Sequence, residues 1–234
     1  MSGAAALGEL VQLHSLEPGE LERFLQRQKA AASLGGDIDL GLQLRQILEK
    51  ARELVPSESG SILLDDPLRK VDDRARNDLC FVAAFGPASE HLAGQQLSAA
   101  EGIVGQVYRT GQPHLSSDVS ADRIFSREID ARTGHLTRSI VAAPIAIGST
   151  VCGVIELVNR LEGTYFTDRD LVILEIFASY TSSTLQNALD AKRAHELARR
   201  DDLTGLYNDR WLHHRLVEVI TGADASGEAC SLIF

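Results

Sequence analysis

Five short apolar runs separated by turn-forming residues constrain the fold of this 234-residue chain most strongly. In chain order they read SILLDD, LCFVAAFG, HLSSDV, SIVAAPIAI and TVCGVIELV. Runs of this length predict strands, and Gly148 and Ser149 between the last two predict a tight hairpin. Helical patterns intervene near Glu101 and across residues 126–133. The chain is therefore predicted to form an α+β domain with a central antiparallel sheet flanked by helices.

Helical periodicity lies on both sides of these runs. Residues 1–36 form a predicted helical lead-in, and a further helix is expected after Asp37, which would act as its N-cap. Nothing interrupts a helix between Thr167 and Arg200. About thirty residues at 1.5 Å each give a rod of roughly 50 Å.

The long helix carries two lines of apolar positions. The first contains Leu171, Leu174, Ala178, Thr181, Leu185 and Ala188, and the second contains Ile173, Ile176, Phe177 and Tyr180. One line can pack on its own domain while the other pairs with a second copy of the chain. We therefore expect a parallel homodimer through helix 168–200, with Leu185 in the seam. An amphipathic helix on a monomer is the alternative.

Composition and charge argue against several classes of function. A net charge of −10 opposes nucleic-acid binding, because that affinity rests on lysine and arginine neutralising phosphates. No apolar run reaches the roughly 18 residues of a membrane-spanning helix, and no signal-peptide pattern is present, so a cytoplasmic protein without a membrane partner is expected. Cys80, Cys152 and Cys230 lack metal-type spacing. We expect no metal site, and buried free thiols at Cys80 and Cys152.

Residues 118–159 place polar side chains between two of the apolar runs. Asp130 offers a carboxylate, and Thr133 and Thr137 offer hydroxyls that can face the same small ligand. The nearby cations Arg123 and Arg138 are expected to form surface salt bridges. No serine or cysteine has an evident base and orienting group at a fitting spacing, so the segment predicts a binding site and no catalytic residues.

This segment resembles the GAF domains of cyclic-nucleotide phosphodiesterases and adenylyl cyclases. The resemblance follows the pattern E-x-D-x-x-T-G-x-x-T-R-S-I, then P-I, then G-V-I-E-L-V-N. It implies a GAF sensor domain at residues 37–187, a linker helix at 188–200, and a cyclic nucleotide as ligand. We expect cAMP, and the sequence leaves cGMP open.

Two other kinds of GAF domain compete with this interpretation. A structural GAF domain would dimerise its neighbours and bind no small molecule. A bilin or haem sensor would need a thiol attachment or an axial histidine. His114 and His135 are interpreted more simply as exposed loop residues.

The resemblance implies a set of ligand-binding residues, namely Ser61, Phe85, Gly102, Ile103, Val104, Asp130, Thr133, Thr137 and Glu156. Backbone N–H groups at the helix start near Gly102 would receive the phosphate. Phe85 would lie against the base, and Asp130 would accept hydrogen bonds from the purine. Glu156 stands in an apolar run, so it either faces solvent by alternation or meets a ligand or an arginine.

The family also carries a signature, N-K-F-D-E, whose lysine and aspartate form a salt bridge below the pocket. This chain has Asn159, Arg160, Phe166 and Asp170 in that pattern, with Leu171 at the last position. The resemblance implies an ion pair between Arg160 and Asp170. Such a pair would couple the pocket floor to the start of the long helix.

Residues 201–216 resemble the opening of a GGDEF domain, the diguanylate cyclase module. They read DDLTGLYNDRWLHHRL, and the family's metal-binding Asp pair and G-G-D-E-F loop do not occur before Phe234. Residues 201–234 are therefore interpreted as the N-terminal part of that domain, without cyclase activity of their own. Mg²⁺ and GTP would serve only a complete GGDEF domain. The resemblance implies that the GAF module regulates such a cyclase through the dimeric helix.

Overall fold

A computed structural model describes residues 40–67, 69–87, 89–92, 94–127, 130–131, 135–161, 165–227, 229 and 231. The predicted lead-in of residues 1–36, the Asp37 cap, Cys230 and part of the predicted helix at 126–133 lie outside these residues. The chain divides into two compact units, Met1–Gln186 and Asn187–Phe234. The domain boundaries expected from the sequence stay predictions.

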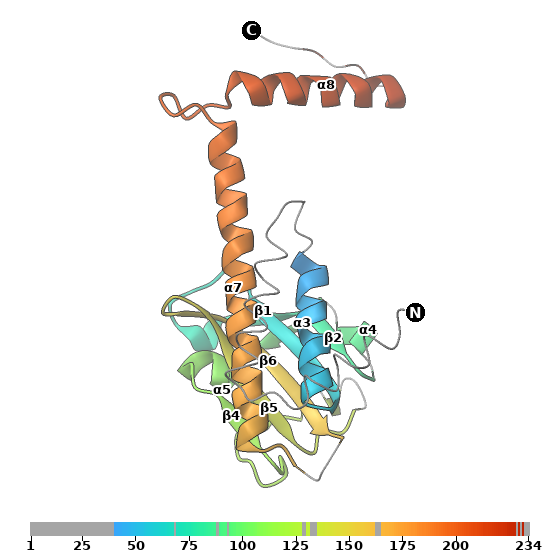
Figure 1. Ribbon diagram of the computed structural model, residues 1–234, viewed down its shortest axis with the longest axis vertical. Coiled ribbons are helices and arrows are strands. Elements are labelled where there is room, and N and C mark those ends of the chain that lie inside the picture. Colours follow the sequence, from blue (N-terminus) through green and yellow to red (C-terminus); the bar gives the residue numbers. More distant parts are fainter. Residues whose placement is uncertain are drawn as a thin grey trace, which may run out of the picture. The chain divides into compact units, whose positions relative to one another are not determined.

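A six-stranded antiparallel sheet forms the centre of the first unit (Figure 1). The strand order is β3-β2-β1-β6-β5-β4. The strands are β1 (Ser57–Asp65), β2 (Asp78–Phe85), β3 (Gln96–Ser98), β4 (His114–Ser116), β5 (Ile140–Ile147) and β6 (Thr150–Arg160). Helices cover this sheet, and the predicted α+β class is confirmed.

The hairpin between β5 and β6 follows the sequence prediction. Gly148 has a φ of 60°, a left-handed conformation that glycine adopts without a Cβ clash. Ile147 pairs with Thr150 across this two-residue turn. At the sheet centre, β1 begins at Ser57, four residues before the expected start, because Ser57 already pairs with Arg160 of β6.

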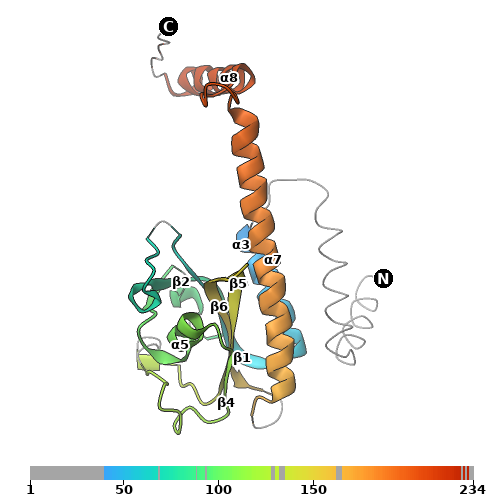
Figure 2. The ribbon, with the colours of Figure 1, turned by 90° about the vertical axis from the view of Figure 1, so that its left-hand side faces the viewer.

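Two layers of helices enclose the sheet (Figure 2). Helix α3 (Leu40–Leu54) and the first part of α7 (Asp168–Arg199) pack on one face, and α5 (Gly102–Thr110) packs on the other. A short 3₁₀ turn, Arg74–Arg76, and the single turn of α4, Ser89–Leu92, lie in the connections. The face under α5 is the one that holds the candidate site.

Tyr108 anchors α5 to the sheet. Its hydroxyl donates to Asp65 Oδ2 at 2.7 Å and accepts from Asn77 Nδ2 at 3.1 Å. Lys70 Nζ lies 2.5 Å from the same Asp65 oxygen. Burial, followed by the hydrogen bond to Asp65, raises the pKa of Tyr108. The hydroxyl therefore stays protonated and holds the last turn of α5 against the sheet.

Both apolar lines of α7 contribute to the core of the first unit. The buried residues are Ile173, Leu174, Phe177, Ala178, Thr181 and Leu185. The expectation that Leu185 faces a second chain is wrong, because its side chain is 7% exposed within this core. The sheet and α3 together pack around a wide arc of α7. Both lines of apolar residues therefore belong to one buried face of this helix.

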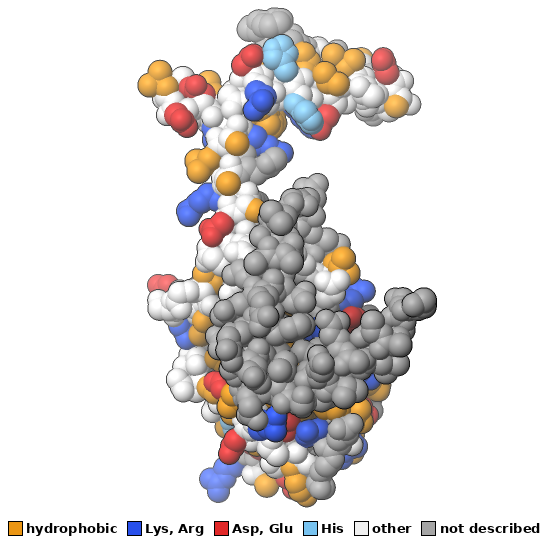
Figure 3. All heavy atoms as spheres, viewed as in Figure 1, with side chains coloured by type: hydrophobic (Ala, Val, Ile, Leu, Met, Phe, Trp, Pro, Cys, Tyr) orange, Lys and Arg blue, Asp and Glu red, His pale blue; other side chains and the backbone are white. Residues whose placement is uncertain are grey.

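The second unit contains the end of α7 and helix α8 (Asp209–Ser226). Asn208 caps α8, accepting from Trp211 N at 2.9 Å, and its Nδ2 donates to Ala198 O at 2.8 Å. Helix α8 buries none of its described side chains, and apolar ones stand on its surface (Figure 3). None of the described helices combines the length and apolar character needed to cross a membrane.

Candidate ligand-binding site

A cavity lies between the sheet and the start of α5. The space inside it is about 880 Å³, counting the part that opens to solvent. Its walls come from all strands but β4, from α4 and the start of α5, and from Phe125, Ser126, Asp130, His135 and Thr137. The lining contains apolar and aromatic side chains and polar or charged ones in nearly equal numbers. This composition suits a small organic ligand with several hydrogen-bonding groups.

Eight of the nine residues predicted to bind a ligand line this cavity. They are Ser61, Phe85, Gly102, Ile103, Val104, Asp130, Thr137 and Glu156. The ninth, Thr133, lies outside the described residues. The sheet register and the position of α5 therefore bring together side chains that are far apart in the sequence.

The start of α5 forms one wall of the cavity. Its N-cap residue, Glu101, is extended and makes no side-chain capping bond, and Gly102 follows with a φ of 74°. The first N–H groups of a helix have no partner within the helix. At this wall they are available to a ligand acceptor, and the helix dipole favours a negative one.

Phe85 forms an aromatic wall at the end of β2. Its ring packs on Gly60 of β1, where an added Cβ would lie 2.7 Å from Phe85 Cε1. The guanidinium carbon of Arg52 lies 4.8 Å from the ring centroid. The ring therefore packs on β1 beside α3, with the core of that face of the sheet, and it borders the cavity at the end of β2. Gly60 is needed for its close approach.

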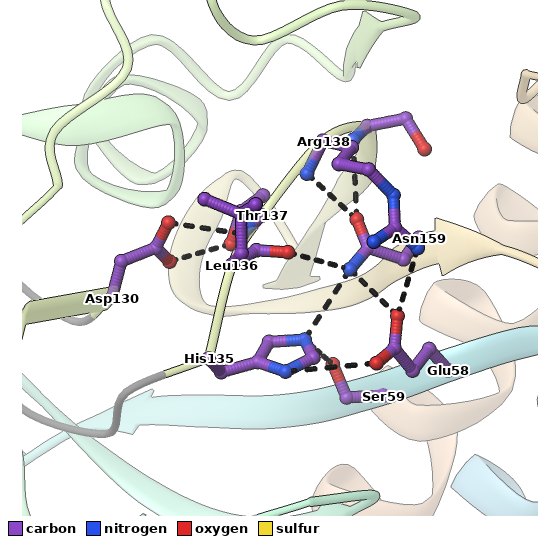
Figure 4. A network of polar contacts seen from close by, with 9 residues as sticks. Glu58, Ser59, Asp130, His135, Leu136, Thr137, Arg138 and Asn159 are labelled. Atoms are coloured by element: carbon purple, nitrogen blue, oxygen red, sulfur yellow. Dashed lines mark hydrogen bonds and ion pairs between the residues drawn. The ribbon is translucent and has the colours of Figure 1, made fainter.

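Asp130 and Thr137 form a local pair beside the cavity (Figure 4). Thr137 donates twice to the Asp130 carboxylate, from its backbone N at 2.9 Å and from Oγ1 at 2.7 Å. A carboxylate has about four acceptor positions. Asp130 is thus fixed in orientation and retains positions that a ligand N–H group can reach.

Glu156 faces the cavity from β6, which decides between the alternatives left open by the sequence. Ser61 Oγ donates to its Oε1 at 2.5 Å. Among the described residues, Ser61 is the hydrogen-bond partner of this carboxyl group. Burial raises the pKa of Glu156 to about 7, although the bond from Ser61 acts in the opposite direction. Near neutral pH the carboxyl group is therefore present in both protonation states.

His135 also lines the cavity, and the prediction that it is an exposed loop residue is wrong. Its side chain is 15% exposed, with Nε2 3.3 Å from Ser59 Oγ and Nδ1 3.8 Å from Glu58 Oε1 (Figure 4). His114 is half-buried as well, in β4, with Nε2 2.8 Å from Asp122 Oδ2. Sequence reasoning missed the position of His135 because its partners Glu58 and Ser59 lie on β1, more than seventy residues earlier in the chain.

Asn159 fixes the backbone of the neighbouring cavity wall. Its Oδ1 accepts from Arg138 N at 2.7 Å, and its Nδ2 donates to Leu136 O and to Glu58 Oε2, both at 2.8 Å (Figure 4). Its φ is 56°, a left-handed conformation found at no other non-glycine residue of the described ranges. Arg138 contacts Glu58 at 3.1 Å with 63% of its side chain exposed, which is the surface salt bridge expected for it.

The predicted ion pair below the pocket is present. Arg160 Nε lies 3.0 Å from Asp170 Oδ2, and both side chains are largely buried. Thr167 donates to the same oxygen from its backbone N at 2.8 Å and from Oγ1 at 2.9 Å. Phe166 is buried beside them. The end of β6 is thereby bonded to the first turn of α7.

The described cysteines are free thiols, and both are half-buried where full burial was expected. Burial raises the pKa of Cys152 to about 11, so this thiol stays protonated at neutral pH. No group of three His, Cys, Asp or Glu side chains suited to a metal ion occurs in the part of the chain that the structure describes.

The family model for the GAF domain matches residues 43–186. The chain belongs to the GAF domain family. Relatives of this GAF domain include the bovine cone cGMP-specific 3′,5′-cyclic phosphodiesterase subunit alpha′, 33% identical over 78% of the chain and 20% of its own length. The Drosophila melanogaster dual 3′,5′-cyclic-AMP and -GMP phosphodiesterase 11 is 32% identical over 82% of the chain and 14% of its own length. The chain thus spans a fifth or less of these relatives.

Solved structures share the GAF fold. The GAF domain of a phosphoenolpyruvate-protein phosphotransferase from Coxiella burnetii superimposes with a TM-score of 0.60 and 17% identity, over 76% of this chain and 96% of that domain. Part of a methyl-accepting chemotaxis protein gives a TM-score of 0.57 with 25% identity, over 73% of this chain and 98% of that one. The GAF domain is thus related in sequence to phosphodiesterases, which is consistent with a regulatory signalling module.

Proposed function

We propose that this GAF domain is the sensor of a signalling protein and that its cavity binds a 3′,5′-cyclic purine nucleotide, with cAMP as the expected ligand. One observation carries the proposal. The cavity combines the uncapped start of α5, an aromatic wall at Phe85, and carboxyl groups at Asp130 and Glu156. The helix start complements the phosphate of such a nucleotide, Phe85 complements the face of the base, and the carboxyl groups complement its hydrogen-bonding edges.

The phosphate would bind at the start of α5. A cyclic phosphodiester carries one negative charge, and backbone N–H groups at a helix start bind anions without a cationic side chain. Gly102 to Val104 line the cavity at this point. The described lining contains no lysine or arginine, so the helix start is its main anion-binding feature.

The purine would lie against Phe85, with its N–H donors directed at Asp130. A carboxylate suits these donors because it only accepts hydrogen bonds. Thr137 already orients Asp130, which reduces the entropy lost on binding. Thr133 would add a hydroxyl, as the family resemblance implies.

The relatives support a cyclic nucleotide as the class of ligand, but they do not decide between adenine and guanine as its base. The bovine relative is named for cGMP, and the Drosophila relative is named for both cAMP and cGMP. The preference for cAMP rests on the sequence resemblance alone. Both nucleotides therefore belong in the binding experiment.

The output of the sensor would pass through α7 to the GGDEF start at 201–234. The Arg160 to Asp170 ion pair would transmit a change in the pocket floor to the first turn of α7. A second copy of the chain would pair along helix 168–200, where Leu189 and Leu197 are 51% and 63% exposed. A diguanylate cyclase needs two GTP-bearing modules face to face, which such a parallel dimer would provide.

Calorimetry of the purified protein with cAMP and with cGMP tests the proposal. We expect micromolar or tighter binding of at least one, and an excess of 100 times the dissociation constant adds about 2.7 kcal/mol to the stability. 5′-AMP, which carries an open phosphate, is the matched control and should bind more weakly. A melting temperature that neither cyclic nucleotide changes would support the alternative of a structural GAF domain without a ligand.

A further inference from the structure

Glu156 occupies an unusual place for an ionisable side chain. It lies near the middle of β6, the strand paired with both β1 and β5, and its register partners there are Ser61 and Ala142. Its neighbours on the same face of β6 are Val154 and Val158, both buried. The residue is partly buried, and its carboxylate accepts a hydrogen bond from the Ser61 hydroxyl.

The other charged groups around the cavity do not compensate Glu156. Glu101 at the α5 cap and Asp130 add acidic groups, and His135 is the remaining titratable side chain of the described lining. The imidazole nitrogens of His135 lie near Glu58 and Ser59 of β1 (Figure 4). The described lining provides no lysine or arginine to hold the Glu156 carboxylate.

We propose that Glu156 is a proton-linked ligand group, which carries a proton when an anionic ligand fills the cavity. The inference rests on the proposed function, because a cyclic nucleotide is the anion in question. An anion and a carboxylate repel each other, and the repulsion grows as the ligand displaces water from between them. A protonated carboxyl group removes that repulsion and adds an O–H donor, so Glu156 can bind an acceptor atom of the ligand.

The direction of the pH effect follows from the burial of this group. Burial raises the pKa of Glu156 to about 7, so both protonation states of the empty site occur near neutral pH. A bound anion favours the protonated form further, and filling the site takes up a proton. Affinity for the anion is then full at acidic pH and falls as pH rises through 7. A neutral ligand with N–H donors gives the opposite trend, because it prefers the carboxylate.

Calorimetry with cAMP and cGMP between pH 6 and pH 8.5, in two buffers of different ionisation enthalpy, measures the proton uptake directly. We expect affinity about tenfold weaker at pH 8 than at pH 6, with uptake of part of a proton at pH 7. The variant Glu156→Gln keeps the shape and a donor but cannot titrate, so its uptake and this pH dependence should vanish. Asp122→Asn, a carboxylate paired with His114 outside the lining, should keep both.

The outcomes separate this inference from the proposed function. Binding without proton uptake, or an unchanged pH profile in Glu156→Gln, overturns the role of Glu156 and leaves the proposed function standing. Absence of binding at every pH instead contradicts the proposed function. In that case a ¹³C NMR titration of the ligand-free protein tests the role of Glu156. A Glu156 carboxyl group that titrates near neutral pH supports the proposed proton linkage, and one that titrates in the usual acidic range overturns it.

Discussion

Asp170 Oδ2 accepts from Arg160 Nε at 3.0 Å and from Thr167 N at 2.8 Å, so one oxygen serves both an ion pair and the start of α7. The ion pair joins the last residue of β6 to the third residue of the helix. The side chains of Arg160 and Asp170 are 17% and 5% exposed. Removal of either charge therefore leaves the other buried without its counter-charge.

Asp170→Asn should destabilise the protein by about 3 kcal/mol, because breaking a buried ion pair leaves an uncompensated charge. Urea unfolding followed by circular dichroism measures this loss. Arg138→Ala is the matched control, since it removes the exposed pair with Glu58 and should cost about 0–1 kcal/mol. Equal effects of the two substitutions would show that the buried pair contributes no more than the surface one.

Gly60→Ala should weaken cyclic-nucleotide binding. The new Cβ would lie 2.7 Å from both Phe85 Cε1 and Leu157 Cδ2 and 2.9 Å from Glu156 O, so the Phe85 ring and its neighbours on β6 must move. Titration calorimetry measures the change. Gly222→Ala in α8, where nothing lies within 4 Å of the added Cβ, should leave the affinity as it is. An affinity for Gly60→Ala like that of the unsubstituted protein would remove Phe85 from the proposed base site.

Asp130→Ala should weaken nucleotide binding by about 1–3 kcal/mol through the loss of a hydrogen-bonded charge. Thr137→Val separates a direct contact from an indirect one, because it leaves the carboxylate but removes the bond from Oγ1. We expect a smaller loss in that variant, measured by the same calorimetry. If Asp130→Ala binds as tightly as the unsubstituted protein, Asp130 is no part of the pocket.

Asn159→Ala and Asn159→Gly distinguish the two roles of this residue. Both remove the side-chain bonds to Leu136, Arg138 and Glu58, but only glycine adopts a φ of 56° without strain. We expect the alanine variant to be less stable than the glycine variant by about 1–2 kcal/mol. Thermal unfolding gives the comparison. Faster amide exchange at 136–139 in both variants would report the lost side-chain bonds, and unchanged exchange would contradict that role.

Light scattering at tens of micromolar tests the homodimer. Leu189→Glu and Leu197→Glu place charges on exposed positions of α7 and should shift the mass to that of a monomer. Leu185→Lys should instead destabilise the first unit, because that side chain belongs to its core. Val217→Glu on α8 is the control at an equally exposed position. A monomer mass for the unsubstituted protein would contradict the dimer outright.

The sequence alone determined the features that depend on neighbouring residues or on a continuous motif. Gly148 and Ser149 predict the hairpin because two-residue turns favour such residues locally. The extent of α7 follows from an uninterrupted helical pattern after Thr167. The match to the family pattern was enough to select Arg160 and Asp170, which are ten residues apart and do form an ion pair.

Only the tertiary structure decided which long-range partners the polar residues meet. Alternation along β6 puts Glu156 on one face, but the β1–β6 register sets it opposite Ser61, 95 residues away, and α5 then closes the cavity over both. The same holds for His135, whose partners lie on β1, and for Leu185, which α3 and the sheet leave no room to face a second chain. Helical and strand periodicity define faces of single elements, whereas packing between elements decides what each face contacts.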